Sequence, residues 1–168
     1  DAVFEAMKKS LEQKLPGYQV AIGSRNKAED KFMIRTYSDK SRGAYYFYDK
    51  NTEALTKLAD LSPWLNEKDL SDMQPVSYTS RDGLTIQGYL TLPKGVKPKN
   101  LPVVINPHGG PWARDYWGFN PEVQFLANNG YAVLQMNFRG STGFGKKFWQ
   151  ASFKQWGRTM QDDISDGV

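Results

Sequence analysis

The spacing of apolar residues predicts one helix and a small β-sheet in the first 75 residues. Residues 3–15 favour an amphipathic helix, ended by Pro16-Gly17, because apolar side chains recur three to four positions apart at Val3, Phe4, Met7, Leu11 and Leu15. Short alternating runs follow, separated by polar turn segments, at 18–24, 31–38, 44–49 and 54–58. They predict an antiparallel meander of about four strands. Its aromatic residues fall on both faces, which indicates a sheet with neighbours.

The pattern changes after Pro75, and residues 62–75 are a candidate linker. Residues 76–92 predict two antiparallel strands joined at Arg81-Asp82-Gly83. In the second strand, Ile86, Gly88, Leu90 and Leu92 share one face, and the other face is expected to be exposed to solvent.

Two continuously apolar runs, 101–106 and 131–137, are typical of strands covered on both faces. Between them lies a predicted helix, with Asn120 suited to the N-cap, Pro121 to the first turn and Gly130 to the C-terminal stop. A glycine-rich loop then leads into a helical segment at 148–157, and a further helix begins near the end of the chain. The strand–helix–strand order predicts a parallel pair and therefore the beginning of an α/β domain.

Composition narrows the classes of function. The 39% hydrophobic and 14% aromatic content of the 168 residues is sufficient for a folded core. The net charge of +4 comes from residues 76–168, with 10 Lys and Arg against 6 Asp and Glu, because residues 1–75 have 12 of each kind. These basic residues are scattered, and no run reaches the roughly 20 apolar residues of a membrane span. We therefore expect neither a nucleic acid nor a membrane as partner.

The absence of cysteine and the character of the first residues exclude a few further features. The chain has no cysteine, which excludes a disulfide and a thiolate nucleophile. Its charged start lacks the apolar region of a signal peptide and does not begin with Met, so the natural N-terminus and any export signal are expected upstream.

The segment NPHGGPW, residues 106–112, contains His108, the single histidine of the chain. As a metal ligand His108 would need further ligands, and only carboxylates such as Asp115 and Glu122 stand nearby. As the general base of an α/β-hydrolase it comes too early, because the triad order is Ser, then Asp or Glu, then His. We expect no metal site and no cofactor.

A second motif, GSTGFGK at residues 140–146, fits the G-x4-G-K pattern of a phosphate-binding loop. The position that should be Ser or Thr to hold Mg²⁺ is Lys147. The alternative is that these glycines only permit a tight turn.

The motif HGGP follows an apolar strand, as in the loops that supply an oxyanion-hole N–H to serine hydrolases. Gly109 and Gly110 let the backbone approach a substrate, and Pro111 fixes the exit direction. The plain alternative is a Gly-Gly-Pro turn. The nucleophile is missing, because Ser141 in RGSTG has Arg139 where the G-x-S-x-G elbow requires glycine. The chain alone therefore cannot hold a serine-hydrolase triad.

Residues 100–148 closely resemble the prolyl oligopeptidase family of serine peptidases, and best its branch of acylaminoacyl peptidases and dipeptidyl-peptidase-like enzymes. The paired motifs HGGP and NFRGSTGFG, with LANNGYAV between them, carry the resemblance. It implies that residues 1–75 are the last part of a β-propeller with its linker. Residues 76–168 would be the start of an α/β-hydrolase domain, incomplete here, so that the chain is an internal piece of a longer enzyme.

The resemblance also implies roles for individual residues. The backbone of Gly110, with Gly109, supplies the oxyanion-hole N–H, whereas His108 and Pro111 shape the loop. A second loop near the active site contains the remaining candidates, Arg139, Gly140, Gly143 and Gly145. Phe144 departs from the tyrosine that is common at its position.

The expected partners are a short peptide substrate and the remainder of the enzyme's own chain, and the 168 residues alone should be inactive. Two alternatives stay open: an esterase on the same scaffold, and a non-catalytic interaction module. The sequence also leaves open the choice among acylaminoacyl, dipeptidyl and prolyl specificity, the oligomeric state, and a cytoplasmic or periplasmic location.

Overall fold

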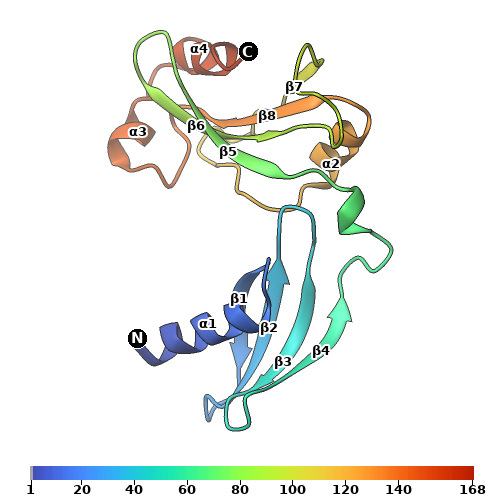
Figure 1. The fold of residues 1–168 in the computed structure, drawn as a ribbon. Helices are drawn as coiled ribbons and strands as arrows, with labels where there is room; N and C mark the ends of the chain where they lie inside the picture. Colours follow the sequence, from blue (N-terminus) through green and yellow to red (C-terminus); the bar gives the residue numbers. More distant parts are fainter. Residues whose placement is uncertain (1) are drawn as a thin grey trace. The chain divides into compact units, whose positions relative to one another are not determined.

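The computed structural model describes residues 2–168, which form two compact units, residues 2–68 and 69–168 (Figure 1). Each unit has its own four-stranded sheet and its own buried apolar cluster. Among the described residues, no helix is both long and apolar enough to cross a membrane.

The first unit is a helix followed by an antiparallel meander, which confirms the elements predicted for this region. The strands lie side by side in chain order, so each turn joins two hydrogen-bonded neighbours. The elements are α1 (Ala2–Lys14), β1 (Gln19–Arg25), β2 (Lys31–Tyr37), β3 (Ala44–Asp49) and β4 (Ala54–Asp60).

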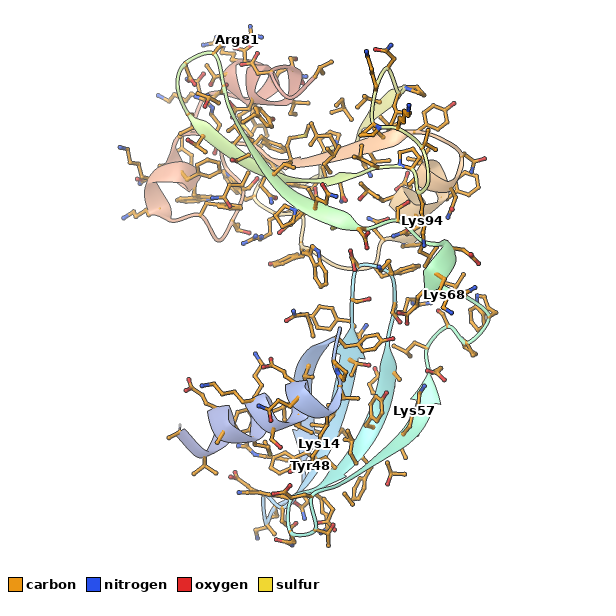
Figure 2. The ribbon with its side chains drawn as sticks, in the orientation of Figure 1. Lys14, Tyr48, Lys57, Lys68, Arg81 and Lys94 are labelled. Carbon is orange, nitrogen blue, oxygen red and sulfur yellow. The ribbon has the colours of Figure 1, made fainter. Side chains whose placement is uncertain are left out.

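Helix α1 covers one face of this sheet. Its apolar stripe, including Met7 and Leu11, packs in one cluster with Phe32, Ile34 and Tyr48 of the strands. At the end of the helix, the Nζ atom of Lys14 lies 5.7 Å from the centre of the Tyr48 ring (Figure 2). On the opposite face Tyr45 and Phe47 are 38% and 37% exposed, so only one face has a core inside this unit.

The second unit is a mixed sheet with helices. Its strand order is β5-β6-β8-β7, with β5, β6 and β8 antiparallel and β7 parallel to β8. The 3₁₀ helix η1 (Glu67–Asp69) precedes it in the chain. The elements are β5 (Met73–Thr79), β6 (Thr85–Thr91), β7 (Val103–Ile105), α2 (Pro121–Asn128), β8 (Ala132–Asn137), α3 (Lys146–Gln150) and α4 (Thr159–Ser165).

The two apolar runs behave differently. All six residues of β8 are buried, as predicted, because the apolar core covers one face of this strand and the segment around Asp115 covers the other. Strand β7 forms the edge of the sheet, and Val103 is 51% exposed. The expectation that residues 101–106 are covered on both faces is therefore wrong for the described chain. An apolar run does not reveal whether other elements of the described chain cover both faces of its strand.

The faces of the second sheet differ in polarity. Ile86, Leu134 and Met136 form the core on one face, packed with Phe138 and with Met160 of α4. Side chains of the opposite face include Gln87, Gln135 and Asn137, which alternate with those core positions along β6 and β8.

Helix α2 begins as predicted. The side chain of Asn120 accepts hydrogen bonds from the backbone N–H groups of Glu122 and Val123. The buried Gln124 binds the preceding segment in both directions: its Nε2 donates to the carbonyl of Ser71 at 2.8 Å, and its Oε1 accepts from the N–H of Ser71 at 2.9 Å. This pair attaches α2 to the segment that leads into β5.

The segment 148–157 is helical only at its start. Helix α3 ends at Gln150, and the chain then turns, with Lys154 at φ 60° and Gly157 at φ 68°. These left-handed backbone positions cannot continue a right-handed helix, so the prediction of a longer helix is wrong.

Candidate functional site

The HGGP loop leaves the end of β7, and its two glycines differ in what they require. Gly110 has φ +132°, and a Cβ atom there would lie 2.9 Å from the backbone nitrogen of Trp112. A Cβ atom on Gly109 would meet nothing within 4 Å. Glycine is therefore needed at Gly110 for backbone reasons, whereas Gly109 borders open space. The Gly110–Pro111 peptide bond is cis.

His108 points from this loop toward the glycine-rich loop. Its ring stacks on Phe138, with centroids 4.5 Å apart, and its Nε2 atom lies 2.8 Å from the hydroxyl oxygen of Ser141. The Ser141 hydroxyl donates to the carbonyl of Phe138 at 2.7 Å. A carbonyl can only accept, so the hydroxyl proton of Ser141 points to Phe138. By the same rule Nδ1 of His108 donates to the carbonyl of Gly109 at 2.9 Å. The direction of the contact between Nε2 and Ser141 depends on the tautomer of the ring. A serine that is 0% exposed and bonded in this way is not placed to attack a substrate.

The two loops also meet next to Gly143. The N–H of Thr142 donates to the carbonyl of Ala113 at 2.9 Å. The guanidinium carbon of Arg114 lies 4.6 Å from the ring centre of Phe144, and a Cβ atom on Gly143 would run into Nη1 of Arg114. The space over Gly143 is therefore filled by an arginine side chain, which disfavours an open phosphate cradle at residues 140–146.

The other glycines of this loop take part in its turns. The N–H of Gly140 donates to the carbonyl of Phe148, and the carbonyl of Gly145 accepts from the N–H of Trp149. Gly145 is the residue before α3, where no side chain caps the helix.

Asp115 fixes the HGGP loop to the polar face of the sheet. Its N–H donates to Oδ1 of Asn137 at 2.8 Å, and its carboxylate accepts from Nε2 of Gln135 at 3.0 Å. Burial raises the pKa of the Asp115 carboxyl. Its Oδ2 atom and Oε1 of Gln135 have no hydrogen-bond partner within residues 2–168.

Arg139 forms a buried ion pair that joins the glycine-rich loop to α4. Asp163, which is 0% exposed, accepts from the backbone N–H and Nε of Arg139 through Oδ2 and from Nη2 through Oδ1, at 2.7 to 2.9 Å. Asp82 also binds Nη2 at 2.7 Å. The hydrogen bonds that Arg139 donates to Asp163 raise the pKa of Arg139, and the hydrogen bond from Arg139 lowers the pKa of Asp82. Arg139 thus connects three segments through its charge.

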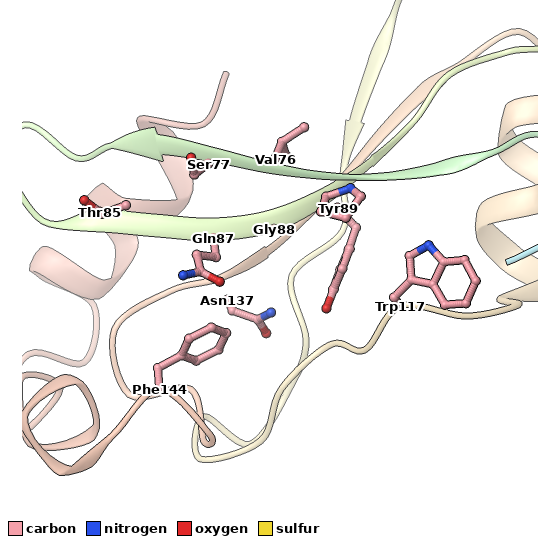
Figure 3. Close-up of a pocket in the computed structure, with 10 residues that line it drawn as sticks. Val76, Ser77, Thr85, Gln87, Gly88, Tyr89, Trp117, Asn137 and Phe144 are labelled. Carbon is pink, nitrogen blue, oxygen red and sulfur yellow. The ribbon is translucent and has the colours of Figure 1, made fainter. Parts of the chain in front are cut away.

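A hollow of about 460 Å³ lies on the polar face of β5 and β6. Figure 3 shows Gln87 and Tyr89 of β6 beside Asn137 of β8, with Trp117 and Phe144 from the two loops. None of the residues that line this hollow is charged.

The sequence missed Arg114, Asp115 and Asn137 as partners of the two loops. The available signal was the segment WARD directly after HGGP, because it places an arginine and an aspartate beside the glycine motif. Within residues 2–168 no group of three or more His, Asp or Glu side chains is placed to hold a metal ion.

Comparison with known proteins places this site in a family. A model of the prolyl oligopeptidase family matches residues 117–168. Dipeptidyl aminopeptidase BIII of Pseudoxanthomonas mexicana is 43% identical over 176 residues, covering 100% of this chain and 25% of that protein. Dipeptidyl peptidase family member 6 of Caenorhabditis elegans is 36% identical, covering 73% of this chain and 20% of that protein. The chain belongs to the prolyl oligopeptidase family.

Solved structures agree on the fold. Acylaminoacyl peptidase of Pyrococcus horikoshii superimposes with a TM-score of 0.69 at 21% identity, over 89% of this chain and 24% of that one. A puromycin-hydrolyzing peptidase of Mycobacterium tuberculosis gives a TM-score of 0.71 at 21% identity, over 90% of this chain and 24% of that one. The chain spans about a quarter of the length of these relatives, and less of some others.

Proposed function

We propose that this chain is part of a serine peptidase that hydrolyses short peptides of the dipeptidyl or acylaminoacyl type. In this proposal residues 1–75 are the end of a β-propeller with its linker, and residues 76–168 begin an α/β-hydrolase domain. The support is membership of the family and the 43% identity to a dipeptidyl aminopeptidase over the whole chain.

The role proposed for this chain is to hold the tetrahedral oxyanion with the backbone N–H of Gly110. The observation that carries it is the contrast between the glycines: Gly110 has a backbone conformation that other residues rarely adopt, and it lies beside the open space at Gly109. Losing one such donor typically lowers kcat by about 10²–10³. His108, Pro111 and the loop of Arg139, Gly140, Gly143 and Gly145 keep the surrounding backbone in shape.

The 168 residues do not supply the nucleophile in this proposal. A fluorophosphonate probe, which reacts with activated serines, should leave the isolated chain unlabelled and should label the full-length protein on one serine. Labelling of the isolated chain that disappears in Ser141→Ala would overturn the proposal, because the pair of His108 and Ser141 would then be the reactive one.

Substrate class is tested with the full-length protein. A dipeptidyl or acylaminoacyl amide with a chromogenic leaving group should be cleaved with a higher kcat/KM than a matched ester of a simple acid. Turnover of the ester alone would identify an esterase, and failure of every probe and substrate would identify a non-catalytic module.

A further inference from the structure

The guanidinium of Arg114 is held by two aromatic rings. Its central carbon lies 4.7 Å from the ring centre of Tyr116 and 4.6 Å from that of Phe144. Its Nε donates to the backbone carbonyl of Asp115 at 3.2 Å. Within the part of the chain that the structure describes, no carboxylate forms an ion pair with Arg114. We call these three residues, Arg114, Tyr116 and Phe144, the Arg114 stack.

The Arg114 stack connects the two loops of the candidate site. Arg114 and Tyr116 follow the HGGP motif, whereas Phe144 belongs to the glycine-rich loop. Gly143 leaves room for the guanidinium, because a Cβ atom at that position would collide with Nη1. The guanidinium contacts one ring of its own loop and one ring of the other loop, so these cation–π contacts attach the two loops to each other.

Gly110 lies between two attachments of its loop to the glycine-rich loop. On its N-terminal side, Nε2 of His108 forms a hydrogen bond with the hydroxyl of Ser141. On its C-terminal side, the attachments are the bond from Thr142 to Ala113 and the Arg114 stack. Gly109 and Gly110 themselves are exposed, so the direction of their N–H groups depends on these flanking attachments.

We propose that Arg114 is a positioning residue, which acts through Phe144 to fix the direction of the Gly110 N–H. This proposal rests on the oxyanion role given to Gly110 above. A catalytic group that is misplaced by about 1 Å can cost roughly 10²-fold in rate, even when the mutation lies away from the reacting atoms. The stack would therefore matter more for kcat than for KM.

The kinetic test uses the full-length protein and its Arg114→Ala variant, with Arg158→Ala as the matched loss of an exposed arginine in the same unit. We expect kcat, counted per serine labelled at the end point of a fluorophosphonate reaction, to fall about 10- to 100-fold in Arg114→Ala. KM should change less than about twofold, and Arg158→Ala should match the parent. A residue that only stabilises the fold would lower the number of labelled serines and leave kcat per labelled serine unchanged, which would overturn the proposal.

A double-mutant cycle tests the route through Phe144. Phe144→Leu should reproduce the loss in kcat, Phe144→Tyr should retain activity because the ring remains, and Arg114→Ala with Phe144→Leu should lose little more than either single change. Losses that multiply in the double variant would show independent roles and would overturn the proposal.

Hydrogen–deuterium exchange separates failure of this proposal from failure of the proposed function, because it needs no activity. In full-length Arg114→Ala, the backbone of residues 108–118 should exchange faster than in the parent, whereas β6 should exchange at the parent rate. Faster exchange in a protein that no fluorophosphonate labels would support the stack as the attachment and refute the peptidase. An unchanged exchange rate at residues 108–118 would refute the positioning role of the Arg114 stack, whatever the activity of the variant.

Discussion

Nε2 of His108 lies 2.8 Å from the hydroxyl oxygen of Ser141, and that hydroxyl donates to the carbonyl of Phe138. The contact has the residue types of a catalytic pair but not its hydrogen-bond pattern, because the serine proton is directed to a backbone carbonyl. A nucleophilic serine would give its proton to the histidine, whereas Ser141 is buried and gives its proton to the backbone. The pair therefore joins two loops.

The role of His108 predicts how its loss affects activity. His108→Phe keeps the aromatic stack on Phe138 and removes the hydrogen bond to Ser141. We expect kcat of the full-length protein to fall by roughly 10- to 100-fold, with the pH profile keeping its shape, because no proton transfer is lost. Loss of roughly 10⁴-fold or more, together with the limb of the profile that reports the base, would show that His108 belongs to the triad.

The two glycines of the HGGP motif predict unequal costs. Gly110→Ala should lower the free energy of unfolding by about 1–3 kcal/mol, because alanine at φ +132° is strained. Gly109→Ala is the matched control, with a methyl group in open space, and should change it by less than about 0.5 kcal/mol. Urea unfolding of both variants, followed by tryptophan fluorescence, makes the comparison. Equal costs would contradict this account of the loop.

The ion pair of Arg139 and Asp163 predicts a large loss of stability. Asp163→Ala removes a fully buried carboxylate and leaves the guanidinium with Asp82 alone, so we expect a loss of about 3–5 kcal/mol. The exposed Arg81, which pairs with Asp162 and Asp166 at the tip of the β5–β6 hairpin (Figure 2), offers the contrast. Arg81→Ala should cost no more than about 1 kcal/mol. Thermal or urea unfolding that ranks the two changes in the reverse order would contradict this prediction.

Acid should weaken the second unit through Asp166. Hydrogen bonds from Arg81 lower the pKa of Asp166 to about 2, whereas an unperturbed Asp has a pKa of about 3.9. The bond therefore contributes fully above about pH 4, and its contribution is lost as the pH falls toward 2. Arg81→Met should flatten the pH dependence of stability in this window.

The control for this experiment is Lys97→Met, which removes an exposed lysine from a loop. Its unfolding curve between pH 2 and pH 5 should run parallel to that of the parent. If Arg81→Met also ran parallel to the parent, Asp166 would not be the group that titrates.

Local sequence patterns were sufficient to predict those helices and strands that are determined by residues close together in the sequence. The cap of Asn120 and the buried strand β8 were predicted, because a capping side chain and a continuous apolar run act within a few residues. The surface that α1 covers was not predicted. An apolar stripe shows that a helix is covered on one side without showing which sheet covers it.

The sequence predicted the motifs of the candidate site, but it did not predict the contacts that connect its two loops. The positions of Gly110 and Arg139 follow from HGGP and NFRG, but the contacts of Arg114 with Phe144 and of Asp115 with Asn137 join residues 20 to 30 positions apart. Such contacts depend on the path of two loops, which no local periodicity specifies. The need for glycine at position 143 follows from the side chain of Arg114, which fills the space that a Cβ atom would occupy.

The carboxylate of Asp163 has a consequence for how α4 is oriented. Its Oδ2 atom accepts from both the backbone N–H and the side chain of Arg139, and the hydroxyl of Tyr78 binds the carbonyl of the same aspartate. Turning the helix by one residue, about 100° about its axis, would carry Asp163 away from all of these donors at once. Asp163 therefore fixes the rotation of α4 together with the pairs that Asp162 and Asp166 form with Arg81, and the apolar face of Met160 and Ile164 fills the space that this orientation leaves.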